Sequence, residues 1–103
     1  MTEKVLLNSG YKYFKEEHPR NCDRYYQKKI AGFNDEPTKF FSVYYYDKFG
    51  TQGELDYDFE YEYVEERENY WYKTYIWGLD KNVPYTIEEI EEMLVGKRND
   101  NDM

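Results

Sequence analysis

The sequence predicts an α+β fold, an antiparallel four- to five-stranded β-meander with one C-terminal α-helix packed on one face of the sheet. Three observations support this prediction. Residues that favour strands dominate positions 11–79. The segments between the predicted strands are short, which favours antiparallel neighbours. A helix start signal then follows at Thr86.

The composition indicates one domain with an aromatic core. Leu, Ile, Val and Phe total only 20 of 103 residues, but the chain also holds 14 Tyr and 2 Trp. Each aromatic ring can bury about 150–250 Å², so these rings replace the missing aliphatic side chains. We expect a single α+β domain over residues 1–96 and a polar, frayed C-terminal tail over 97–103. The single cysteine cannot form an internal disulfide, which favours the cytoplasm.

Five strands are predicted, over 11–15, 24–30, 39–47, 54–65 and 70–79, and a short strand over 5–7 could precede them. Turn residues at 8–10 come before the first strand. A loop is predicted over 31–37, because Gly, Asn-Asp and Pro follow one another there. Gly50 and Gly53 bound the connection to the fourth strand, and a tight turn near 66–69 leads to the fifth.

The C-terminal helix has the clearest local signal. Thr86 and Glu89 match the Thr-x-x-Glu capping box, whose loss costs about 1 kcal/mol. Gly96 is the expected end of the helix. The apolar residues at helical spacing are Ile87, Ile90, Met93 and Leu94. The side chains expected to face water are Glu88, Glu89, Glu91 and Glu92.

Residues 54–63 alternate acidic and apolar side chains, as in a strand with one anionic and one aromatic face. Residues 1–53 have 9 Lys/Arg and 7 Asp/Glu, a net charge of +2, whereas residues 54–103 have 5 and 15, a net charge of −10. Carboxylates on alternate strand positions lie about 6.7 Å apart. Their repulsion is about 0.6 kcal/mol in water but about 2.5 kcal/mol at an effective dielectric constant near 20. Burial of these acids without cations is therefore excluded, and they are expected to face solvent, as a plain charged surface, or a basic partner.

The register of the last hairpin decides what shares the acidic face. If Glu62 lies opposite Lys73, opposite charges meet and Lys73 stays out of the core. A slip of one residue would bury both tryptophans, and we favour the first register. The core would then receive Tyr61, Tyr63, Tyr72 and Ile76. The predicted partner-binding residues on the exposed face are Asp56, Asp58, Glu60, Glu62, Trp71, Tyr75 and Trp77.

Signals for catalysis, metals and cofactors are weak. His18 and Cys22 are too few for a zinc site. The spacing of acids from Asp56 resembles a calcium loop, but Tyr61 stands where that loop needs Gly and Arg67 where it needs Glu. There is no phosphate-binding glycine loop. A net charge of −8 opposes direct contact with nucleic acid. We expect no catalytic residues, no metal and no cofactor, and a protein that does not bind membranes.

These observations favour a non-enzymatic acidic interaction protein that binds a basic protein surface, on a nucleic-acid-handling protein. Phage-encoded inhibitors and bacterial immunity proteins share its small size and negative charge. One alternative is a ligand-binding module in which Trp71, Tyr75 and Trp77 form an aromatic platform for a sugar or a cationic small molecule. Another is a structural or accessory subunit. Both a monomer and a homodimer fit the sequence.

Overall fold

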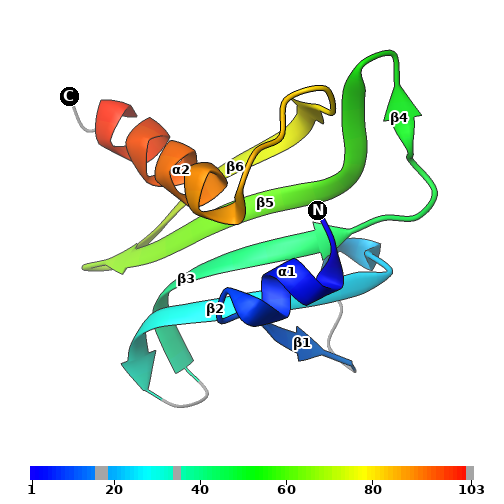
Figure 1. Ribbon diagram of the computed structural model, residues 1–103. Helices are drawn as coiled ribbons and strands as arrows, with labels where there is room; N and C mark the ends of the chain where they lie inside the picture. Colours follow the sequence, from blue (N-terminus) through cyan, green and yellow to red (C-terminus); the bar gives the residue numbers. More distant parts are fainter. Residues whose placement is uncertain (16–18, 34–35, 102–103) are drawn as a thin grey trace.

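The computed structural model describes residues 1–15, 19–33 and 36–101 (Figure 1). Its helical segments are α1 (Glu3–Asn8), the 3₁₀ turn η1 (Pro19–Asn21) and α2 (Ile87–Asn101). Its strands are β1 (Lys12–Phe14), β2 (Arg24–Phe33), β3 (Glu36–Tyr45), β4 (Thr51–Gln52), β5 (Leu55–Arg67) and β6 (Tyr70–Asp80).

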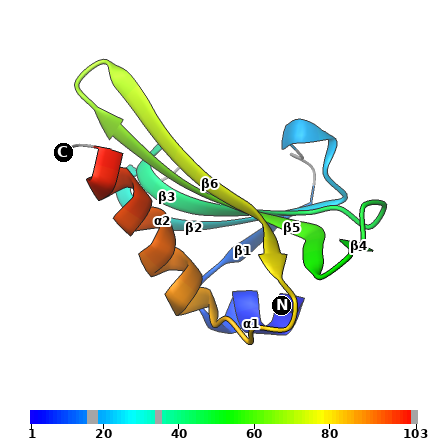
Figure 2. The same ribbon diagram turned by 90° about the horizontal axis from the view of Figure 1, so that it is seen from above.

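The strands form an antiparallel sheet in the order β1-β2-β3-β5-β6, and the short β4 pairs with the beginning of β5. The sheet curls into a half-barrel, and α2 crosses one of its faces (Figures 1 and 2). The predicted α+β class and the meander with a C-terminal helix are confirmed. Within the described part of the chain, no helix combines the length and apolar character needed to cross a membrane.

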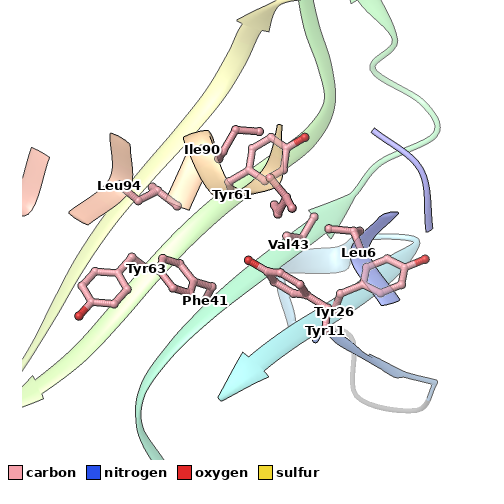
Figure 3. Close-up of a cluster of buried hydrophobic side chains, with 10 residues drawn as sticks. Leu6, Tyr11, Tyr26, Phe41, Val43, Tyr61, Tyr63, Ile90 and Leu94 are labelled. Carbon is pink, nitrogen blue, oxygen red and sulfur yellow. The ribbon is translucent and has the colours of Figure 1, made fainter. Parts of the chain in front are cut away.

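The main core lies between this face of the sheet and the two α-helices (Figure 3). Leu6 of α1 packs in the same cluster as the apolar stripe of α2. Tyrosine rings supply much of the cluster, as the composition predicts. The buried residues of the core are Leu6, Tyr11, Tyr26, Phe41, Val43, Tyr61, Tyr63, Ile87, Ile90 and Leu94. We call this side of the sheet the helix face.

The start of α2 has the predicted capping box. The backbone N–H of Thr86 donates to Glu89 Oε1 at 3.0 Å, and the N–H of Glu89 donates to Thr86 Oγ1 at 3.1 Å. Two details of the prediction are wrong. The helix continues through Gly96 to Asn101. Glu91 does not face water, because its carboxylate accepts bonds from the Tyr11 hydroxyl at 2.7 Å and from Lys28 Nζ at 3.0 Å.

Residues 5–7 are helical, so the predicted short strand there is wrong. Thr2 caps the helix by accepting a bond from the N–H of Val5 at 3.3 Å. Leu6 is buried while its two neighbours Val5 and Leu7 are exposed. Leu6 is therefore the residue through which α1 packs into the core.

The predicted loop over 31–37 is largely strand, because β2 runs to Phe33 and β3 begins at Glu36. The register shifts between Lys29 and Gly32, which accommodates the glycine at φ +121°. The connection predicted between Gly50 and Gly53 contains the two-residue strand β4. The tight turn after β5 is confirmed, with Glu68 in the left-handed region at φ +52°.

Candidate functional site

Among the residues that the structure describes, no α-helix covers the second face of the sheet, which we call the open face. The segment around η1 lies over part of it, on the side of the sheet away from α1 and α2 (Figure 2). Cross-strand pairing brings alternate residues of four strands onto this face. These residues are Tyr25, Gln27 and Lys29 of β2, Phe40, Ser42 and Tyr44 of β3, Glu60, Glu62, Val64 and Glu66 of β5, and Trp71, Lys73, Tyr75 and Trp77 of β6.

Arg20 binds two acids of the alternating segment 54–63. Its Nη1 donates to Glu60 Oε1 at 2.7 Å, and its Nη2 donates to Glu62 Oε2. Glu60 is only 8% exposed and Glu62 only 2%. The expectation that these two acids face solvent or a partner is therefore wrong. The reasoning that they need a cation holds, but the cation comes from η1 of the same chain.

Tyrosine hydroxyls complete this cluster. Tyr44 donates to Glu62 Oε1 at 2.7 Å, and Tyr46 donates to Glu60 Oε1 at 3.3 Å. Burial and the bond to Glu62 raise the pKa of Tyr44, and burial with the charge of Glu60 raises the pKa of Tyr46 to about 12. The Arg20 guanidinium also lies over the Tyr44 ring, 4.6 Å from its centroid. We call these five residues the arginine cluster.

Two further acids of the segment 54–63 accept hydrogen bonds from backbone N–H groups. Asp56 Oδ1 accepts a bond from the N–H of Asp58 at 2.8 Å, and Asp58 Oδ1 accepts one from the N–H of Gly50 at 2.9 Å. Both side chains are half-buried. They hold the bend of β5, where the pairing with β6 is irregular between Asp56 and Glu60.

The aromatic residues of β6 do occupy the exposed face that the favoured register predicts. Trp71 is 52% exposed, Tyr75 57% and Trp77 42%. The pairing itself is displaced by two residues, since Glu62 lies opposite Tyr75 and Lys73 lies opposite Val64. A shift of two keeps every side chain on its face, so the faces are right although the partners are wrong. Tyr72, predicted in the core, is 39% exposed.

Trp77 is held more firmly than Trp71. Its indole Nε1 donates to the backbone oxygen of Tyr57 at 2.9 Å. The rings of Phe49 and Tyr57 meet the indole edge-on, with centroids 5.5 and 5.4 Å away. Trp77 therefore anchors one end of the open face, next to the arginine cluster.

Two adjoining hollows lie at the other end of the open face and share Phe40 and Trp71. The smaller, about 300 Å³, extends toward the arginine cluster and includes Lys73. The larger, about 570 Å³, opens toward the ends of β2 and β3. The residues lining the smaller hollow are Tyr25, Phe40, Tyr44, Glu62, Val64, Trp71 and Lys73. Those lining the larger are Phe33, Glu36, Pro37, Thr38, Phe40, Glu66 and Trp71.

The imidazole and thiol side chains of the chain are those of His18 and Cys22. Cys22 is buried, and burial raises the pKa of its thiol, which disfavours the reactive thiolate. His18 lies outside the described residues. Among residues 1–15, 19–33 and 36–101, no three His, Cys, Asp or Glu side chains are placed to hold a metal ion. The open face offers aromatic surface, hydrogen-bonding groups and charge.

Comparison of the chain with known protein families, with curated proteins and with solved structures found no match.

Proposed function

We propose that this chain is a non-enzymatic binding protein whose open face docks on a basic surface of another protein. The observation that carries this proposal is the exposed aromatic row of β6, in which Trp71, Tyr75 and Trp77 are all 42–57% exposed. Trp and Tyr are the residue types that most often dominate the energy of protein interfaces. The arginine cluster and the Trp77 contacts hold the sheet beneath these rings in place.

Charge supports the choice of a basic partner. The chain as a whole carries a net charge of −8. That field would attract a basic surface and speed association, with a strong dependence on salt. Proteins that handle nucleic acid present such surfaces, because they bind the phosphate backbone. We therefore place the partner in this class and the interaction in the cytoplasm, as an inhibitor or immunity protein would act.

Of the predicted partner-binding residues, the aromatic ones would contact the partner directly. Glu60 and Glu62 would act by holding Arg20 and the sheet, and Asp56 and Asp58 by holding the bend of β5. Substitution of Trp71 or Tyr75 should therefore abolish binding without unfolding the protein.

The test is affinity capture with matched variants. The wild-type protein and the variants Tyr75→Ala, Trp71→Ala and Tyr70→Ala are immobilised and exposed to lysate at about 50 mM and 300 mM salt. Tyr70 is the control, because it is 65% exposed on the same strand but lies on the other face of the sheet. It is adjacent to Trp71, and adjacent residues of a strand point to opposite faces. Circular dichroism and thermal unfolding verify that each variant is folded.

The proposal requires a captured protein that binds the wild type and Tyr70→Ala, loses most binding with Tyr75→Ala or Trp71→Ala, and releases at high salt. That protein should be basic at its contact surface when purified and mapped. A binding partner insensitive to all the open-face substitutions, or a captured set that the variants leave unchanged, would overturn it.

A further inference from the structure

The larger hollow of the open face combines apolar walls with an acidic rim, and we call it the acidic groove. Its apolar wall is formed by Phe33, Pro37, Phe40 and Trp71. Glu36 and Glu66 both line it and are exposed to solvent. Glu66 lies directly opposite Trp71 in the β5–β6 pairing, and both residues line the groove.

The two rim carboxylates are available for a guest. Among the residues that the structure describes, neither Glu36 nor Glu66 forms an ion pair. The basic residues of the open face nearest in register are Lys29, opposite Phe40, and Lys73, opposite Val64. Neither of them lines the groove. The groove thus differs in charge from the smaller hollow next to it, which includes Lys73.

We infer that the acidic groove receives an arginine side chain of the partner protein, an inference that rests on the proposed function. A guanidinium group can stack on the face of Trp71 while its N–H groups donate to Glu66 and Glu36. A lysine ammonium lacks this flat shape and is more strongly hydrated, so it fits the apolar wall less well. The arginine cluster has the same chemistry within the chain, with a guanidinium on an aromatic ring between two glutamates.

The test uses three capped tripeptides that differ only in the central residue, which is Arg, Lys or Gln between two glycines. Each is titrated into ¹⁵N-labelled protein, and the backbone amides and the two tryptophan indole N–H signals are followed by nuclear magnetic resonance. We expect the Arg peptide to shift the signals of Trp71, Phe40 and Phe33 with saturation in the millimolar range. The Lys peptide should bind at least threefold more weakly, and the Gln peptide should cause no saturable shift.

Charge variants then locate the binding. The double variant Glu36→Gln/Glu66→Gln should weaken Arg-peptide binding at least threefold. Glu68→Gln is the matched control, because Glu68 is an exposed acid of the adjoining turn that does not line the groove. It should change binding less than 1.5-fold. Equal binding of the Gln peptide, shifts confined to Tyr75 and Trp77, or equal effects of the two charge variants would overturn the inference.

Failure of this inference differs from failure of the proposed function. If the Arg peptide does not bind in the groove but the Tyr75→Ala variant still fails to capture the partner, only the inference of an arginine site is wrong. If the Arg peptide binds as expected but no captured protein depends on Tyr75 or Trp71, docking of a protein on the open face is wrong.

Discussion

Replacement of Arg20 by alanine tests the central electrostatic feature of this fold. Arg20 reaches from η1 to two acids of β5, and its side chain is 35% exposed while those of Glu60 and Glu62 are 10% and 3% exposed. The variant leaves two carboxylates on alternate positions of one strand without their cation. Their remaining donors are neutral hydroxyls of Tyr44 and Tyr46.

The expected loss of stability is about 3 kcal/mol. Two carboxylates about 6.7 Å apart at an effective dielectric constant near 20 repel by about 2.5 kcal/mol, and charge-assisted hydrogen bonds are lost as well. Breaking a fully buried ion pair costs about 3–5 kcal/mol. Water that enters through the exposed side of Arg20 reduces this, so the lower end applies. For a domain of about 100 residues the unfolding midpoint should fall by roughly 10–20 °C.

The assay is urea unfolding at pH 7, followed by circular dichroism, with Arg24→Ala as the control. Arg24 pairs with Glu3 at 3.9 Å, and both side chains are about half exposed, so its loss should cost less than about 1 kcal/mol. A second comparison places Arg20→Ala in a Glu60→Gln/Glu62→Gln background, where it should also cost less than about 1 kcal/mol. The reasoning fails if Arg20→Ala costs no more than Arg24→Ala, or if the glutamine background does not reduce its effect.

Three further predictions concern the helix cap, the tyrosines and the glycines. Thr86→Ala should destabilise the protein by about 1 kcal/mol in the same urea assay, because it removes the acceptor at the start of α2; an unchanged midpoint would contradict the capping role. Burial raises the pKa of Tyr26 and of Tyr46 to about 12, above the ordinary value of 10. The stability that this shift provides is present below pH 10 and is lost as the pH rises through 12, since the unfolded chain releases these protons first. Urea midpoints between pH 9 and 12 measure it, and a midpoint that stays constant above pH 10 would refute it. Gly32→Ala should cost roughly 3 kcal/mol, because a Cβ would meet backbone atoms of β3 at 2.5 Å, whereas Gly53→Ala, also at positive φ but in open space, should cost about 1 kcal/mol. Equal decreases in the thermal unfolding midpoint of the two variants would show that the contact between the added Cβ at position 32 and the backbone of β3 costs no stability.

Local signals were sufficient to predict much of the fold. The capping box at Thr86 and the strand-forming residues of β5 and β6 act within a few residues of one another, so the sequence displays them directly. The prediction that Trp71 and Trp77 are exposed follows from the requirement that Lys73, on the same face of the strand, stays out of the core. The exact pairing did not follow, because the irregular bend between Asp56 and Glu60 shifts the register by two without changing any face.

The pairing of Arg20 with Glu60 and Glu62 could not be predicted from periodicity. Arg20 and Asn21 lie in the left-handed region, at φ +64° and +55°, in a segment with no strand or helical repeat to orient its side chains. The sequence did indicate that the acids needed a cation if buried, but not which one. Helix α1 was missed for a related reason, since six residues with one buried leucine give too short a pattern to separate helix from strand.

The division of charge along the chain coincides with an exposed turn at Gly53 and Glu54, between β4 and β5. Separation of the chain there would give a fragment of net charge +2 and one of −10, from the counts of 9 and 7, and of 5 and 15, charged residues. The contacts that would rejoin them include the β3–β5 pairing and the ion pairs of Arg20 with Glu60 and Glu62 and of Lys28 with Glu91. The molecule is therefore built as two complementary, oppositely charged pieces. Such fragments should reassemble on mixing faster at low salt than at high salt, which would make the turn a natural point for a split reporter of association.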